Sequence, residues 1–175
     1  MADIERKGVI TFKGNPLTLI GPEIKVGDKA PDFRVVGKDL SEVTLAGSKG
    51  KTRLLSVVPS LDTPVCEQQS KRFNEEASKL PSDVVVITVS VDLPFAQNRF
   101  CASHHADKIT VLSDYRENSF GKNYGVLIKE LKLLARAIFV VGPDDKVQYV
   151  EYVKEVTQHP DYDKALNALK AGAGK

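Results

Sequence analysis

The residues in this sequence best suited to chemistry are its two cysteines, Cys66 and Cys101. Cys66 follows Thr63 and Pro64, a pair typical of the beginning of a helix, so its thiol is expected in the first helical turn. Free backbone N–H groups and the positive end of the helix dipole both stabilise an anion there. The spacing therefore predicts a position where a thiol is readily converted to a thiolate.

A helix terminus alone stabilises a thiolate only modestly. Lowering a thiol pKa from about 8.5 to about 6 requires about 3.4 kcal/mol, whereas a helix N-terminus typically supplies about 0.3–1 kcal/mol. A reactive Cys66 would therefore need a cation nearby. The alternative is a structural cysteine, because Cys66 shares a helical stripe with Phe73, Ala77 and Leu80, and a buried cysteine behaves as a small apolar side chain. Spacing alone leaves both interpretations open.

The surroundings of Cys101 favour reactivity. A helix is expected over residues 94–106, and the polar side chains predicted to share the face of Cys101 are Gln97, Asn98, His104 and His105. The opposite face is predicted to be apolar, with Phe95, Ala96, Phe100, Ala102 and Ala106. A cysteine on a polar face is expected to be accessible to a reaction partner rather than to fill a core. The two histidines are expected to face solvent, and a role in tuning Cys101 stays open.

Arg136 is the candidate cation, because it stands in the otherwise apolar strand expected over residues 135–141. A buried arginine needs an anionic or hydrogen-bonding partner. That partner would be a carboxylate, such as Asp62 or Glu67, or a thiolate at Cys66. The planar guanidinium could also bind a substrate oxygen.

Other chemistries fit the sequence poorly. The two cysteines lie too far apart in the chain for the Cys-x-x-Cys motif of thiol–disulfide exchange. Together with three histidines and no second close cysteine pair, they also make a poor zinc site, so no metal is expected. A net charge of +2, without a basic cluster, argues against nucleic-acid binding.

Composition and the N-terminus set the expected class and compartment. The chain has 175 residues, of which 42% are hydrophobic and 27% charged, typical of one globular domain spanning residues 1–175. The first residues lack the apolar segment of a secretory signal, and no apolar run is long enough to span a bilayer. A cytoplasmic protein is expected, in which paired cysteines are more often catalytic or redox-sensing than structural.

Hydrophobic periodicity predicts alternating strands and helices. Strands are expected over residues 9–12, 17–20, 33–36, 43–45, 54–58, 83–90, 110–112, 135–141 and 146–153. Helices are expected over residues 63–80, 94–106, 117–124 and 161–171, followed by a frayed tail from Gly172. This order predicts an α/β thioredoxin-like fold, a mixed central sheet flanked by helices, with an N-terminal β-hairpin extension.

Several segments resemble one known family. Residues 59–66 (PSLDTPVC) resemble the peroxiredoxin motif Pro-x-x-x-Thr/Ser-x-x-Cys, and residues 92–101 (DLPFAQNRFC) resemble the resolving-cysteine helix of bacterial thiol peroxidases, the atypical two-cysteine peroxiredoxins. Similar segments of that group are residues 12–16 (FKGNP), 38–45 (KDLSEVTL) and 134–137 (LARA). The resemblance runs from about residue 8 to about residue 170.

The resemblance implies a role for each matching residue. Cys66 would be the peroxidatic cysteine, Cys101 the resolving cysteine, Thr63 and Arg136 the activating pair, and Pro59 the residue that shields the site from water. It also implies a homodimer, thioredoxin as reductant and no cofactor. One departure is that residues 132–135 (KLLA) lack a glycine usual in the group, so a slightly different loop is expected with no loss of chemistry.

The implied reaction is the reduction of organic hydroperoxides or hydrogen peroxide through a Cys66 sulfenic acid and a Cys66–Cys101 disulfide. A disulfide requires Cα atoms within about 7 Å, so local unwinding around one or both cysteines is predicted. Two alternatives stay open: a structural disulfide, and a redox-sensing interaction module that uses the same cysteine chemistry without turnover.

Overall fold

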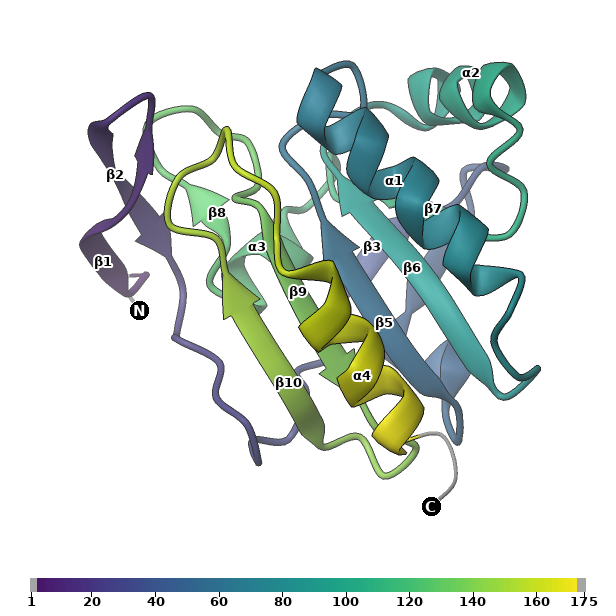
Figure 1. Ribbon diagram of the computed structural model, residues 1–175. Helices are drawn as coiled ribbons and strands as arrows, with labels where there is room; N and C mark the ends of the chain where they lie inside the picture. Colours follow the sequence, from purple (N-terminus) through teal and green to yellow (C-terminus); the bar gives the residue numbers. More distant parts are fainter. Residues whose placement is uncertain (1–2, 173–175) are drawn as a thin grey trace.

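The computed structural model describes residues 3–172 of the chain. Seven strands form a mixed sheet in the order β10-β9-β5-β6-β7-β3-β4, in which β5, β6 and β7 run parallel and the other pairs are antiparallel (Figure 1). The strands are β3 Arg34–Val36, β4 Glu42–Thr44, β5 Thr52–Val57, β6 Val84–Ser90, β7 Thr110–Ser113, β9 Ala137–Val141 and β10 Val147–Tyr152. The predicted mixed sheet is therefore confirmed.

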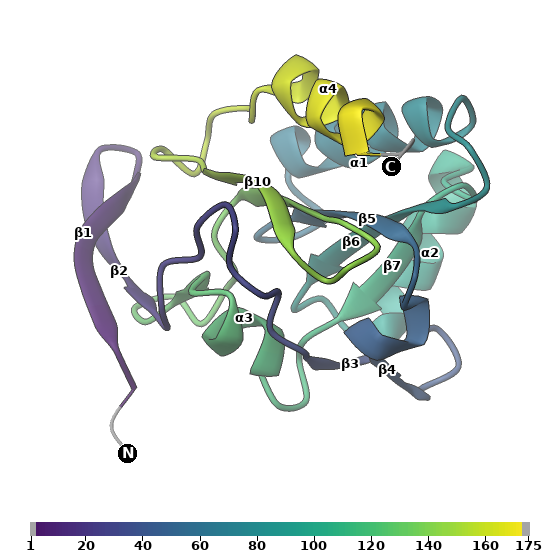
Figure 2. The same ribbon diagram turned by 90° about the horizontal axis from the view of Figure 1, so that it is seen from below.

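Helices cover both faces of this sheet. They are α1 Pro64–Ala77, α2 Pro94–His104, α3 Ser119–Asn123 and α4 Tyr162–Gly172, and a 3₁₀ turn, η1, spans Leu45–Ser48. Figure 2 shows α1 and α4 on one side of the sheet and α3 on the other. All four predicted helices are present, although α1 ends at Ala77 and α3 begins at Ser119. The tail was expected to fray from Gly172, which instead is the last residue of α4, and residues 173–175 lie outside the described part of the chain.

The central strands are buried along their length because both of their faces are covered. In β5 all six residues are buried, and successive residues enter opposite cores: Leu54 packs toward α1 and α4, and Leu55 packs toward α3. Leu166 and Leu169 of α4 are buried in the same core as Leu54, as predicted. That core also contains Cys66 and therefore holds the first turn of α1 against the sheet.

The N-terminal hairpin is longer than predicted and belongs to a second sheet. Strands β1 Glu5–Phe12 and β2 Asn15–Ile20 pair with each other, and β2 pairs with a short strand, β8 Leu127–Ile128, that the sequence did not predict. The hairpin also docks on residues 154–156, through Thr11 N–H to Lys154 O at 2.7 Å and Val156 N–H to Thr11 O at 2.9 Å. These contacts bring the hairpin tip beside segments that follow it by more than a hundred positions.

Within residues 3–172, no helix is long and apolar enough to cross a membrane.

Candidate active site

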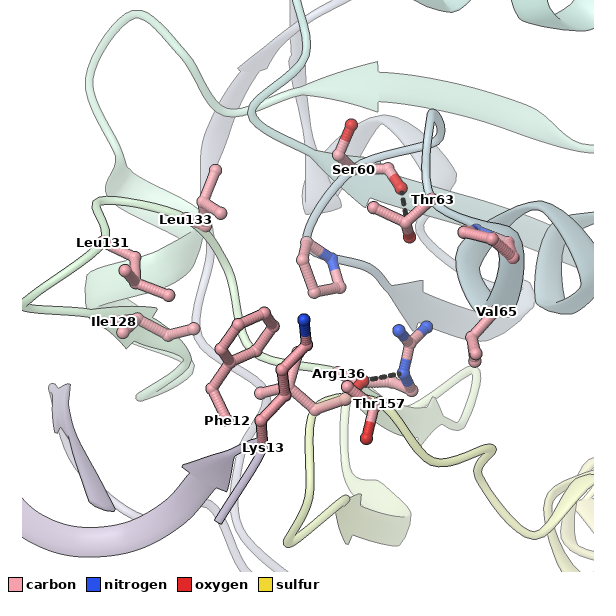
Figure 3. A pocket seen from close by; sticks show the side chains of 13 residues that line it. Phe12, Lys13, Ser60, Thr63, Val65, Ile128, Leu131, Leu133, Arg136 and Thr157 are labelled. Carbon is pink, nitrogen blue, oxygen red and sulfur yellow. Dashed lines mark hydrogen bonds between the residues drawn. The ribbon is translucent and has the colours of Figure 1, made fainter. Parts of the chain in front are cut away.

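A cavity of about 480 Å³ lies where four segments meet (Figure 3). Its residues come from the hairpin tip, the loop that enters α1, the segment between β8 and β9, and the loop after β10: Phe12, Lys13, Pro59, Ser60, Thr63, Pro64, Val65, Ile128, Leu131, Leu133, Arg136, Val156 and Thr157. Most of these side chains are apolar. Three of the five residues predicted to act in catalysis, Pro59, Thr63 and Arg136, therefore line one cavity.

Cys66 lies in the first turn of α1, as the sequence predicted. Thr63 is the N-cap, with extended backbone (φ −105°, ψ 148°), and Pro64 is the first helical residue. The Cys66 side chain is free and 0% exposed, packed in the same apolar core as Phe73 and Phe100. Its neighbour Val65 lines the cavity while Cys66 does not. The thiol thus lies both at the N-terminal end of α1 and in the apolar core. Val65, the preceding residue, lines the cavity.

Arg136 is held by neutral partners. The side chain is 2% exposed, Nε donates to Val156 O at 3.0 Å, and Nη1 donates to Gln69 Oε1 at 3.0 Å. Gln69 is itself buried and donates from Nε2 to Ser56 Oγ at 2.8 Å. Because both acceptors are uncharged, the positive charge of Arg136 remains available to an anion.

The carboxylate partner considered for Arg136 is not found. Among residues 3–172 no acidic side chain forms an ion pair with it. Glu67 instead contacts Lys71 Nζ at 2.8 Å and His104 Nε2 at 3.3 Å, and Asp62 is exposed. The interpretation of Arg136 as the partner of a buried carboxylate is therefore wrong for the described residues.

Thr63 and Pro59 shape the entrance to α1. The Thr63 hydroxyl donates to Ser60 O at 3.1 Å, and its side chain makes no capping hydrogen bond to the helix. Pro59 is buried directly after β5 and lines the cavity. The hydroxyl of Thr63 is thus beside the cavity but engaged with its own loop.

The predicted division of α2 into a polar face with Cys101 and an apolar face is partly wrong. The inward side of α2 carries Pro94, Gln97 and Phe100, whereas Phe95, assigned to the apolar face, is 66% exposed. Gln97 is buried because its amide finds two acceptors, Ser90 Oγ at 3.0 Å and Leu112 O at 2.9 Å. Hydrogen bonding to the sheet, rather than hydropathy, thus orients the helix.

Cys101 lies half-buried at the edge of the core that contains Cys66. Burial raises the pKa of the Cys101 thiol, and the nearby charge of Lys38 acts in the opposite direction. Cys101 opens onto a second cavity, of about 600 Å³, between α2, β7 and the β3–β4 turn. The two cavities share no lining residue. Cys101 thus opens onto a cavity of its own, whereas Cys66 lines neither cavity.

His104 is not fully solvent-facing, contrary to prediction, whereas His105 is exposed. The His104 ring stacks on Phe100 with centroids 4.3 Å apart, and Nε2 lies 3.3 Å from Glu67 Oε1. It thus joins α2 to the first turn of α1.

Three participants in the site were not identified from the sequence: Gln69, Asp92 and Ser60. Gln69 follows Cys66 by three positions and so lies on the same helical face, a spacing that could have singled it out. Asp92 and Ser60 have no comparable signal in the sequence. They contact each other, through a hydrogen bond from Ser60 Oγ to Asp92 Oδ1, only because the fold brings their two loops together. Within residues 3–172, no group of three or more His, Cys, Asp and Glu side chains could hold a metal ion.

Comparison with known proteins identifies the family. The Redoxin family model matches residues 25–166. The thiol peroxidase of Halalkalibacterium halodurans is 63% identical, over 93% of this chain and 97% of its own, and that of Bacillus subtilis is 57% identical, over 93% and 96%.

Solved structures agree with this relationship. A peroxiredoxin-like protein from Aquifex aeolicus superposes with a TM-score of 0.87 at 46% identity, covering 98% of this chain and 99% of its own. A thiol peroxidase from Chromobacterium violaceum gives a TM-score of 0.82 over 93% and 95% of the two chains, and at 24% identity it supports the fold alone. The thioredoxin-like fold is thereby confirmed, and the chain belongs to the redoxin family, within which it is a thiol peroxidase of the peroxiredoxin type.

Proposed function

We propose that this chain reduces hydroperoxides with Cys66 as the peroxidatic and Cys101 as the resolving cysteine. The proposal is carried by two observations: a thiol lies in the first turn of α1, and Gln69, three positions later, accepts a hydrogen bond from Arg136, a buried cation that lines an apolar cavity and whose hydrogen-bond acceptors in residues 3–172 are neutral. The helix terminus and the guanidinium both favour the thiolate. The guanidinium is the second source of stabilisation that a helix terminus alone does not provide.

The first step forms a sulfenic acid. The Cys66 thiolate attacks the terminal oxygen of R–O–OH, the O–O bond breaks, and the leaving RO⁻ takes up a proton to give the alcohol, or water when R is hydrogen. Arg136 stabilises the negative charge that develops on the leaving oxygen, and Thr63 orients the peroxide. Pro59 and the apolar cavity wall exclude water. Because Cys66 is buried behind Val65, we infer that the Val65 side chain moves to admit the peroxide while the helical turn stays folded.

The second step forms the disulfide. The Cys101 thiol attacks the sulfenic sulfur, a Cys66–Cys101 bond forms, and water leaves. The burial of Cys66 and the separate cavity in front of Cys101 support the proposal that both helices unwind locally before the sulfur atoms meet.

The third step regenerates the thiols, and we propose thioredoxin as the dithiol. Attack on Cys101 expels the Cys66 thiolate, and a second thiol of the reductant then releases Cys101. The raised pKa of Cys101 supports this direction, because a thiol of high pKa is the poorer leaving group. The cysteine is itself the redox centre, so the cycle needs no cofactor.

Assembly and location remain proposals. A homodimer is supported by large apolar side chains that stay exposed in this chain, among them Phe12 and Leu131 at the cavity and Phe95 at the start of α2. A cytoplasmic location is supported by the two free cysteines, which a reducing compartment maintains. The redox-sensing alternative has no support among the related proteins, which are named as peroxidases.

The deciding experiment treats fully reduced protein with one equivalent of cumene hydroperoxide and determines its intact mass and its cysteine peptides. Loss of two hydrogens with a linked Cys66–Cys101 peptide would support the two-cysteine cycle. Oxygen added at Cys66 with Cys101 left free would remove the resolving role, and no change at either cysteine would overturn the proposal. Sustained peroxide consumption with thioredoxin and its reductase then distinguishes an enzyme from a sensor.

A further inference from the structure

Asp92 connects the loop that enters α1 to the segment that enters α2. Its Oδ1 accepts a hydrogen bond from Ser60 Oγ at 2.7 Å, and its Oδ2 accepts bonds from Leu61 N–H at 2.8 Å and Ser90 Oγ at 2.7 Å. No basic side chain among residues 3–172 forms an ion pair with this carboxylate. Its charge is therefore directed entirely to these hydrogen bonds, which are of the stronger, charge-assisted kind.

One arm of the network reaches the peroxidatic turn. Ser60 O accepts hydrogen bonds from Thr63 N–H at 3.3 Å and from Thr63 Oγ1 at 3.1 Å. Thr63 is the N-cap of α1, three positions before Cys66. By fixing Ser60 and Leu61, Asp92 thus fixes the loop on which the first turn of α1 is built.

The other arm reaches the resolving helix. Ser90 Oγ, which donates to Asp92, accepts from Gln97 Nε2 at 3.0 Å, and the same amide donates to Leu112 O at 2.9 Å. Gln97 lies about one helical turn before Cys101. A continuous chain of hydrogen bonds therefore runs from the cap of one cysteine helix to the buried face of the other, and Asp92 is its centre.

We propose that Asp92 is a positioning residue that couples the folding of the two cysteine turns. This inference rests on the proposed two-cysteine cycle. With the Asp92 bonds intact, α1 keeps the helical turn that stabilises the Cys66 thiolate. With them broken, the Ser60–Leu61 loop and the Gln97 turn are released together, and Cys66 and Cys101 can approach each other.

The coupling sets a balance between two steps. Peroxide reduction requires the folded turn, whereas disulfide formation requires the unwound one. Loss of the Asp92 carboxylate should therefore slow the first step and speed the second, because it shifts the same equilibrium toward the unwound state. A general loss of stability would not produce opposite changes in the two rates.

The test compares wild type with Asp92→Ala in quenched-flow experiments read by mass spectrometry, which suits a chain without tryptophan. We expect oxidation of Cys66 by cumene hydroperoxide to slow about tenfold, equivalent to about 1.4 kcal/mol. The conversion of sulfenic acid to disulfide should become faster. Asp92→Asn keeps one carbonyl oxygen and the shape of the side chain, so both rates should change in the same directions but by less. This variant replaces Asp92→Ala if the alanine variant does not fold.

Hydrogen exchange of the reduced proteins tests the coupling itself. Amides in residues 61–67 and 94–101 should both exchange faster in the Asp92 variants, while those of β9 and β10 should not change. Asp28→Ala is the matched control, because the Asp28 carboxylate also accepts a backbone N–H, from Lys25 at 2.8 Å, in a loop bonded to Val147. Asp28→Ala should leave unchanged the rates of Cys66 oxidation and disulfide formation, and the amide exchange of residues 61–67 and 94–101.

The outcomes separate this inference from the proposed function. If wild type neither consumes peroxide nor forms the disulfide, the proposed function fails. If wild type turns over and the Asp92 variants change neither rate, slow both rates, or loosen only one of the two segments, the coupling role of Asp92 is overturned while the function stands.

Discussion

Arg136 Nη1 donates to the side-chain oxygen of Gln69 at 3.0 Å, so an amide, not a carboxylate, holds the buried guanidinium. The neutral partner leaves the positive charge of Arg136 uncompensated near the N-terminal part of α1. A carboxylate in the same place would attract the guanidinium more strongly and would also compensate its charge. The neutral partner thus fixes the position of Arg136 without reducing its capacity to stabilise an anion.

Gln69→Glu should therefore slow the oxidation of Cys66, by about tenfold if the added charge costs the thiolate about 1.4 kcal/mol. The change is nearly isosteric, and Ser56 can donate its hydroxyl proton to the new carboxylate. Gln68→Glu is the matched control, because it adds the same charge one position away on the exposed side of the turn. The second-order rate with hydrogen peroxide at pH 7 measures both variants, and equal rates for the two would contradict the role assigned to Gln69.

The Cys66–Cys101 disulfide should not stabilise the fold. A structural disulfide commonly contributes about 2–4 kcal/mol, but this one requires the turns that carry both cysteines to unwind. Scanning calorimetry of the reduced and oxidised forms should show an oxidised form that melts at or below the temperature of the reduced form. Melting several degrees higher after oxidation would restore the structural-disulfide interpretation.

The apolar cavity should select for substrates with an apolar body. Leu131 lines the cavity and is 41% exposed, so Leu131→Asp should alter the cavity wall without damaging the core. We expect kcat/KM for cumene hydroperoxide to fall about tenfold, the effect of about 1.4 kcal/mol of lost apolar contact, with little change for hydrogen peroxide.

Leu40→Asp provides the control for this substitution. Leu40 is 42% exposed and lies in the turn between β3 and β4, away from the cavity. Leu40→Asp should leave kcat/KM unchanged for both cumene hydroperoxide and hydrogen peroxide. An equal loss with both peroxides in Leu131→Asp would mean that the cavity does not contact the substrate body.

Docking of the N-terminal hairpin should weaken in acid. The hydroxyl of Thr157, with the backbone N–H groups of Thr157 and Gly14, holds the pKa of Glu155 at about 2, below its ordinary 4.5. A depressed acid pKa stabilises the folded state above the unfolded value, and this contribution is lost as the pH falls from 4.5 toward 2. Exchange of the β1 and β2 amides should therefore increase over that interval.

Glu155→Gln should show faster exchange of the hairpin amides already at pH 7 and a weaker change between pH 5 and pH 3 than wild type. The reason is that the amide retains one acceptor and no titrating charge. Exchange in β5 serves as the internal reference. Equal pH dependence in wild type and variant would exclude Glu155 as the group responsible.

The fold was largely predictable because its signals are local. The buried strands β6 and β9 are nearly continuous apolar runs, and Pro64 and Pro94 mark the beginnings of α1 and α2. The strand β8 escaped prediction because two residues carry no periodicity, and it exists only through its pairing with β2.

Motifs and spacing single out the cysteines, Thr63, Pro59 and Arg136 as candidate site residues, and their roles stay predictions. The contacts of these residues were not predictable. The sequence suggested a carboxylate or the Cys66 thiolate as the partner of Arg136, and the amide of Gln69 was not considered. The orientation of α2 was misjudged for a related reason. Hydropathy places a glutamine outside, and only the positions of Ser90 Oγ and Leu112 O make burial of Gln97 favourable.

The wide separation in sequence of the segments around the cavity has a consequence for biosynthesis. Both cysteines leave the ribosome before Arg136 and before β9, the strand that inserts beside β5, because synthesis proceeds from the N-terminus. On the proposed mechanism, the nascent Cys66 thiol therefore lacks Arg136 until that residue has been synthesised. A chain interrupted before that point would lack the proposed activation, so the polypeptide would gain its reactivity toward peroxides only when β9 joins the sheet.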